Sequence, residues 1–149
     1  MTKYILPLLL ILCVPLMVIG CGEVAQPTGL DDPETLDKII AEAVVLKTLQ
    51  KRGKKGERLY YAPNEQTPYT GWMKVVGFNG QVILLAQCKD GKQDGPEIHW
   101  YSGGQKQWEG VCKDGKQEGV TILYNMDGTE SLRTTYKNGK SLGTVTVGR

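Results

Sequence analysis

The fold is decided by the stretch Lys89-Asp90-Gly91-Lys92-Gln93-Asp94-Gly95, which returns 24 residues later as Lys113-Asp114-Gly115-Lys116-Gln117-Glu118-Gly119. A third copy follows after the same interval as Lys137-Asn138-Gly139-Lys140-Ser141-Leu142-Gly143. Other glycines keep this period in a second phase, at Gly80, Gly104 and Gly128. A fixed period of this length indicates an array of repeated supersecondary units.

Each 24-residue unit contains two turn signals. Asp90-Gly91 and its two copies mark one turn, and Asn79-Gly80, Gly103-Gly104 and Asp127-Gly128 mark the other. Such pairs suit tight β-hairpins because their residues tolerate positive φ. A turn roughly every twelve residues predicts two strands per repeat in an up-and-down meander.

Between the turns the residues alternate, which predicts one packed and one solvated face. We expect the packed face to hold Ala86, Cys88, Trp108, Cys112, Ile98, Trp100, Ile122 and Tyr124. We expect the other face to hold Gln87, Glu97, His99, Gln107, Glu109, Arg133 and Thr135. The predicted fold class is mainly β: a single-layer antiparallel meander of 24-residue β-hairpin repeats with one N-terminal helix.

The helix is predicted over residues 33–46. Asp32 can cap it, Pro33 suits its first position, and apolar residues from Leu36 to Val44 fall on one face. The basic stretch 51–56 that follows is expected to be a solvated loop, with a patch for acidic head groups as the alternative.

The N-terminus resembles a secretory signal peptide, since Lys3 precedes an uncharged apolar run from Ile5 to Ile19. The run is shorter than the roughly 20 residues of a membrane span. It ends in Val18-Ile19-Gly20-Cys21, which resembles a bacterial lipobox and predicts lipidation of Cys21. An ordinary signal peptide or a membrane anchor is the alternative. We therefore expect an exported chain, lipid-anchored to the cell envelope, at the outer membrane if the host has two membranes.

The predicted organisation has four parts: 1–20, a lipoprotein signal peptide; 21–31, a lipidated tether; 32–56, the helix and basic loop; and 57–149, the repeat sheet. The formal charge of the whole chain is +2. So balanced a charge, in a chain predicted to be exported, argues against a nucleic-acid partner.

The units Tyr69-Thr70-Gly71-Trp72, 89–95 and Trp100-Tyr101-Ser102-Gly103-Gly104-Gln105 resemble bacterial MORN-repeat variants. The segment 59–68 resembles the entry segment of such arrays, so the resemblance covers about residues 57–143. Members of this family are often described as antitoxin components of a YwqK-type toxin–antitoxin system. The resemblance implies such a role for this chain, and it assigns no site residues.

The residues that could carry catalysis are few. His99 is the only histidine, and alternation is expected to place it on the face opposite Cys88 and Cys112. The two cysteines are expected to lie about 10 Å apart, beyond disulfide reach, as buried small apolar residues. Lysines neutralise the acidic turns, which argues against calcium. We therefore predict a non-enzymatic protein with no cofactor, no metal site and no evident small-molecule substrate.

The predicted function is protein–protein interaction by a membrane-anchored repeat module. A polar and aromatic strip, with His99, Tyr101, Gln107 and Glu109 beside Gln105, is the expected partner surface. A structural envelope component that binds peptidoglycan or membrane is one alternative. An antitoxin or immunity protein is the other.

Overall fold

The computed structural model describes residues 30–147. The signal peptide, Cys21 and most of the tether lie outside these residues. No helix within the described part is long and apolar enough to cross a membrane.

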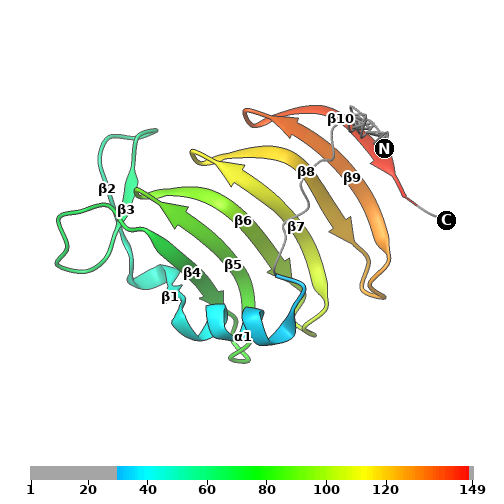
Figure 1. Cartoon of the computed structure of the whole chain (residues 1–149), viewed down its shortest axis with the longest axis horizontal. Helices are drawn as coiled ribbons and strands as arrows, with labels where there is room; N and C mark the ends of the chain where they lie inside the picture. Colours follow the sequence, from blue (N-terminus) through cyan, green and yellow to red (C-terminus); the bar gives the residue numbers. More distant parts are fainter. Residues whose placement is uncertain (1–29, 148–149) are drawn as a thin grey trace, which may run out of the picture.

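Residues 30–147 start with one α-helix and continue almost entirely as strands (Figure 1). The N-terminal elements are α1 (Pro33–Glu42), β1 (Val44–Val45), the 3-10 helix η1 (Leu46–Thr48), β2 (Gln50–Arg52) and β3 (Leu59–Tyr61). The repeat strands are β4 (Gly71–Val76), β5 (Val82–Lys89), β6 (Lys92–Trp100), β7 (Lys106–Lys113), β8 (Lys116–Tyr124), β9 (Glu130–Lys137) and β10 (Lys140–Thr146).

The predicted meander is confirmed. Strands β4 to β10 follow one another in an antiparallel sheet in the order of the sequence, and β1 adds a short parallel strand beside β4. The sheet is open, so β10 forms one of its edges. The part of the chain that the structure describes is therefore one N-terminal α-helix and a mainly β repeat sheet, and the sheet is the one that the 24-residue period predicts.

Two kinds of turn join the strands, as the two turn signals predict. The two-residue turns have positive φ at both positions, 50° and 79° at Asp90-Gly91, and the copies at 114–115 and 138–139 repeat these values within a few degrees. This is the type I′ geometry that matches the twist of a hairpin. The other turns place Gly80, Gly104 and Gly128 at positive φ.

The helix is shorter than predicted. Asp32 caps it as expected, accepting a hydrogen bond of 2.8 Å from the Thr35 backbone N–H. The helix ends at Glu42, four residues before the predicted end, because Val44 and Val45 pair with Met73 and Lys74 of β4 instead. Two β-branched residues in succession favour this extended conformation over helix.

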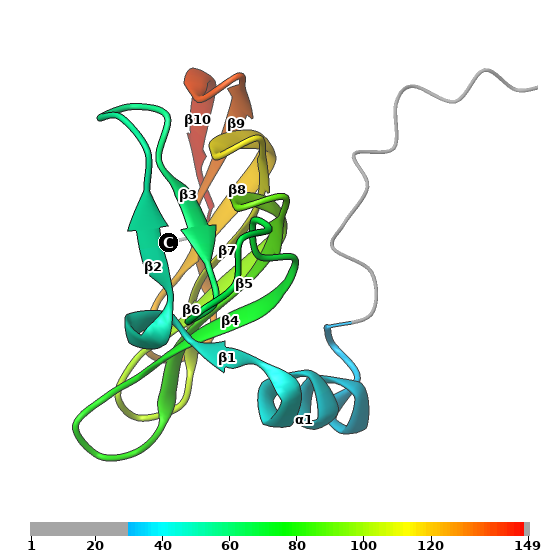
Figure 2. The same ribbon diagram turned by 90° about the vertical axis from the view of Figure 1, so that its left-hand side faces the viewer.

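The β2–β3 hairpin and α1 lie on opposite sides of the repeat sheet (Figure 2). The 51–56 stretch predicted to be a loop contributes its first two residues to β2. Leu49, just before β2, and Tyr60 of β3 pack on Met73, Ala86 and Cys88. We call this side of the sheet the hairpin face.

The other side of the sheet is the helix face. It begins at Lys74, whose Nζ donates to the carbonyl of Ile40 in α1 at 2.6 Å. Residues directly opposite one another in an antiparallel pair share a face. Since Lys74 is opposite Leu85 and Leu85 is opposite Ile98, both apolar residues belong to the helix face, where they are almost fully buried.

The predicted assignment of faces was wrong for every second strand. His99 is opposite Leu84 and Trp108, so it shares the hairpin face with the cysteines, whereas Ile98 and Ile122 lie on the helix face. The reason is the two-residue turn, which pairs Lys89 with Lys92 and so sets even-numbered residues opposite odd-numbered ones. The prediction placed even-numbered residues of both strands on one face, and across this turn such residues lie on different faces.

Candidate functional site

The predicted polar and aromatic strip is not one surface. His99 lies on the hairpin face, whereas Glu109 is opposite Ile98 on the helix face. Glu109 is buried, with 8% of its surface exposed. Tyr101 lies at the turn before β7, and its hydroxyl donates to the carbonyl of Tyr124 at 2.9 Å. Gln107 is the unpaired residue of a β-bulge between His99 and Trp100 on one strand and Lys106 and Trp108 on the other.

Glu109 is the centre of a polar network on the helix face. One carboxylate oxygen accepts from the hydroxyl of Tyr124, and the other accepts from Lys106 Nζ at 2.8 Å. Lys106 also reaches Asp31 at 3.3 Å, so the segment before α1 is tied to β7. Burial raises the pKa of Tyr124 and the neighbouring Glu109 carboxylate raises it further. These hydrogen bonds give each polar group of the network a partner within the fold, so the network joins β7, β8 and the segment before α1.

A second polar group lies on the hairpin face. His99 Nε2 and Glu97 Oε1 are 2.8 Å apart, and the thiol of Cys112 donates to the other oxygen of Glu97 at 3.4 Å. The ring of His99 meets Trp108 edge-on, with centroids 4.9 Å apart. The expectation that His99 and the cysteines lie on different faces of the sheet was therefore wrong. Among residues 30–147 no cluster of histidine, cysteine and carboxylate side chains has a metal-binding arrangement.

The prediction that both cysteines are buried is confirmed, with 1% of Cys88 and 6% of Cys112 exposed, and both are free thiols. Burial raises the pKa of Cys88 to about 11. Burial, together with the charge of Glu97, raises the pKa of Cys112 to about 12. The thiolate is the nucleophilic form, so neither sulfur is activated at neutral pH.

We expect Cys88 and Cys112 to resist alkylation in the folded chain. With a pKa near 11, the thiolate fraction at pH 8.5 is roughly 100-fold below that of an unperturbed cysteine. Iodoacetamide treatment followed by peptide mapping should therefore find both residues unmodified before denaturation and modified after it. Modification of either residue in the folded chain at the rate of the denatured chain would contradict the buried assignment.

The most distinctive surface is the edge of the sheet formed by the type I′ turns. The lysines that flank each turn are opposite one another, as Lys89 and Lys92 are in the first. The turns are joined by a ladder, because the backbone N–H of Asp114 donates to Asp94 and that of Asn138 donates to Glu118. The 24-residue period therefore stacks three lysine pairs along one edge.

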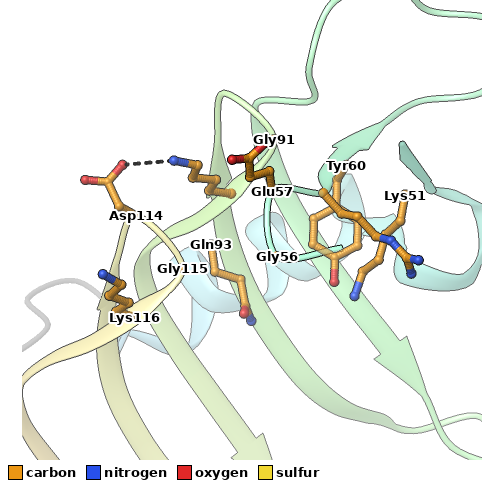
Figure 3. Close-up of a pocket in the computed structure, with 11 residues that line it drawn as sticks. Lys51, Gly56, Glu57, Tyr60, Gly91, Gln93, Asp114, Gly115 and Lys116 are labelled. Atoms are coloured by element: carbon orange, nitrogen blue, oxygen red, sulfur yellow. Dashed lines mark ion pairs between the residues drawn. The ribbon is translucent and has the colours of Figure 1, made fainter. Parts of the chain in front are cut away.

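The loop between β2 and β3 extends this edge. A groove of about 350 Å³ separates it from the first two turns, lined on one side by Lys51, Arg58 and Tyr60 and on the other by Lys92 and Lys116. Figure 3 shows Lys51 and Tyr60 on one side of this groove and Lys116 on the other. Backbone bonds hold the loop segment there, as Tyr60 N–H donates to the carbonyl of Gly91 at 2.9 Å.

We define the basic edge as residues 51–58, 89–94, 113–118 and 137–140. It contains eleven lysines and arginines and five aspartates and glutamates, a difference of +6. Because the full chain carries +2, the rest of the chain carries −4. The balanced composition thus conceals a strong separation of charge, which the folded arrangement creates.

Ion pairs neutralise only part of the basic edge. Within the described residues they join Lys92 to Asp114 at 4.0 Å and Lys137 to Glu118. The hydrogen bond from Lys137, with that from the Asn138 backbone, lowers the pKa of Glu118. Such exposed pairs contribute little to stability, and they leave an excess of positive charge in solvent. Sequence reasoning missed this site because it balanced the turn lysines against the turn carboxylates and did not count loop 51–58 beside them.

Comparison with protein-family models, with curated proteins and with solved structures finds no match to the chain. The resemblance to MORN-repeat variants therefore stays a prediction.

Proposed function

We propose that the protein is a non-enzymatic interaction module that the lipid on Cys21 holds at the membrane and whose basic edge binds an acidic surface of a protein partner. The observation that carries the proposal is the groove in which Lys51 and Arg58 lie across from Lys92 and Lys116 of the stacked turns, in a chain with net charge +2. Charge complementarity of this kind accelerates encounter and fixes the orientation of a partner.

The geometry favours an extended contact over a single anion. Successive type I′ turns are two strands apart, which places their lysine pairs at intervals of about 10 Å. The turn-to-turn hydrogen bonds of Asp114 and Asn138 keep these intervals fixed. Such a row fits acidic groups spread over a protein surface, and little ordering of the row is needed on binding.

The regular spacing also favours a second candidate, a structural envelope component. A polymer with negative charges at repeated intervals, such as peptidoglycan carrying free carboxylates, presents a complementary pattern. An antitoxin or immunity role, which the family resemblance implies, is a special case of the first candidate, with a toxin as the protein partner.

The test is crosslinked capture of the tagged, detergent-extracted chain from its own cells. The variant Lys113→Gln with Lys116→Gln removes two exposed charges from the basic edge, and Lys38→Gln with Lys47→Gln removes two exposed charges elsewhere. We expect a stoichiometric protein partner whose affinity falls about tenfold, or 1.4 kcal/mol, in the first variant only. Equal capture by both variants would contradict a role for the basic edge.

Two further arms separate the remaining possibilities. Recovery of wall fragments in place of a protein, with the same dependence on Lys113 and Lys116, would favour the structural candidate. Cys21→Ser should release the chain from washed membranes, because lipid chains supply the attachment. If that variant remains membrane-bound, the lipid anchor is wrong, whatever the basic edge binds.

A further inference from the structure

Strand β10 is an edge with few of the features that usually protect one. It is the last strand of the sheet, and all of its residues are exposed. Leu142 and Val145 are 68% and 65% exposed. No charged residue or proline occurs from Ser141 to Val147, whereas protected edges usually carry lysines or prolines. The one irregularity is a bulge between Ser141 and Gly143.

The opposite edge of the sheet offers little backbone for pairing. There β1 is only two residues long, and the neighbouring strand β4 is tied to α1 by the bond from Lys74 to Ile40. Strand pairing can therefore extend the sheet at β10. Within the described residues no helix or loop covers this edge.

The hydrogen bonds of β10 show which of its backbone groups are free to pair. Val147 N–H donates to the carbonyl of Ser131 at 3.0 Å. In an antiparallel ladder every second residue bonds inward, so Val145 and Gly143 also bond to β9. The N–H and C=O groups of Thr144 and Thr146 therefore point away from the sheet.

We propose that β10 pairs antiparallel with β10 of a second copy of this chain, about a two-fold axis through Val145. In this register Thr144 of each copy lies opposite Thr146 of the other, so the free backbone groups bond to each other. Val145 then faces its own counterpart on the helix face, where the two side chains meet in a close, non-hydrogen-bonded pair. The two repeat sheets become one continuous sheet.

Charge favours this arrangement over the parallel one. A parallel pairing would set Lys140 of one copy beside Lys140 of the other. The antiparallel pairing separates them by ten residues along the strands, about 33 Å. Because β10 is complementary to itself in this register, the partner that fits this edge is a second copy of the chain.

Cross-linking of the full chain with Val145→Cys tests the register. A non-hydrogen-bonded pair has a Cα separation near 4.5 Å, which lies within the disulfide range. Under mild oxidation we expect a disulfide-linked dimer at least tenfold more abundant than for Ser102→Cys, an exposed control in the turn between β6 and β7. The unsubstituted chain measures the background from the native cysteines, including the free thiols of Cys88 and Cys112. A yield for Val145→Cys no higher than for Ser102→Cys would overturn the proposal.

Sedimentation of the detergent-solubilised full chain tests the pairing without new cysteines. Val145→Lys places two positive charges opposite each other at an exposed position, so the dimer dissociation constant should rise at least tenfold while the fold is retained. Thr144→Pro removes an outward N–H that makes no bond to β9 and should have the same effect. A dimer that persists unchanged in Val145→Lys, or an unsubstituted chain that is monomeric, would overturn the proposal.

Discussion

Replacing Leu85 by alanine should lower the free energy of unfolding by about 2–5 kcal/mol, the range for large-to-small substitutions in a packed core. Leu85 is fully buried on the helix face, between Lys74 and Ile98 on the neighbouring strands. Removing three carbon atoms there loses their transfer from water and leaves a cavity that β4 and β6 cannot readily close. Urea unfolding followed by circular dichroism measures the change.

The matched control is Leu142→Ala. Leu142 belongs to the same sheet but is 68% exposed, so its truncation should change the free energy of unfolding by no more than about 0.5 kcal/mol. Equal effects at the two positions would mean that the helix face at β5 is not a packed core.

Replacing Gly91 by alanine should destabilise the chain more than the same change at Gly115. Both glycines occupy the second position of a type I′ turn with φ of +79°. An L-residue in that conformation costs roughly 1–2 kcal/mol at either site. At Gly91, however, a Cβ atom would lie 2.7 Å from Leu59 Cβ and 3.0 Å from Pro68 Cβ, whereas at Gly115 it would meet nothing within 4 Å.

The difference between the two alanine variants therefore reports the packing of the β2–β3 hairpin against the first turn. Overpacking of this kind costs about 1–3 kcal/mol, and that amount is the expected excess for Gly91→Ala. Both variants are compared by the same urea unfolding. If their free energies of unfolding agree within 0.5 kcal/mol, a threshold typical of neutral surface changes, the hairpin does not pack against Gly91 in solution.

The first pair of variants tests the repeat sheet, and the second pair tests a contact between distant segments of the chain. Leu85 tests the repeat sheet, whose existence follows from the 24-residue period and from turn pairs such as Asp90-Gly91. Gly91 tests a contact between the sheet and a segment about 30 residues earlier in the chain. The first kind of feature is local and repeats, so a pattern reveals it. The second joins distant segments and leaves no periodic signal.

Turn chemistry, the two strands of each repeat and the cap of the helix were all determined by the sequence alone. Asn-Gly and Asp-Gly pairs fix φ at the turns, and Asp32 with Pro33 fixes where α1 begins, because these are properties of neighbouring residues. The burial of Cys88 and Cys112 was predictable from the alternation of residues along their own strands.

Only the tertiary structure decided which residues share a face and which charges share an edge. A two-residue turn sets Lys89 opposite Lys92, and this register moves His99 to the side of Cys112 and Glu109 to the other. Packing of the β2–β3 hairpin brings Lys51 and residues 56–58 beside the stacked turns and so creates the basic edge. Both outcomes depend on pairing between segments that are separate in the chain, and a linear pattern does not contain the geometry of that pairing.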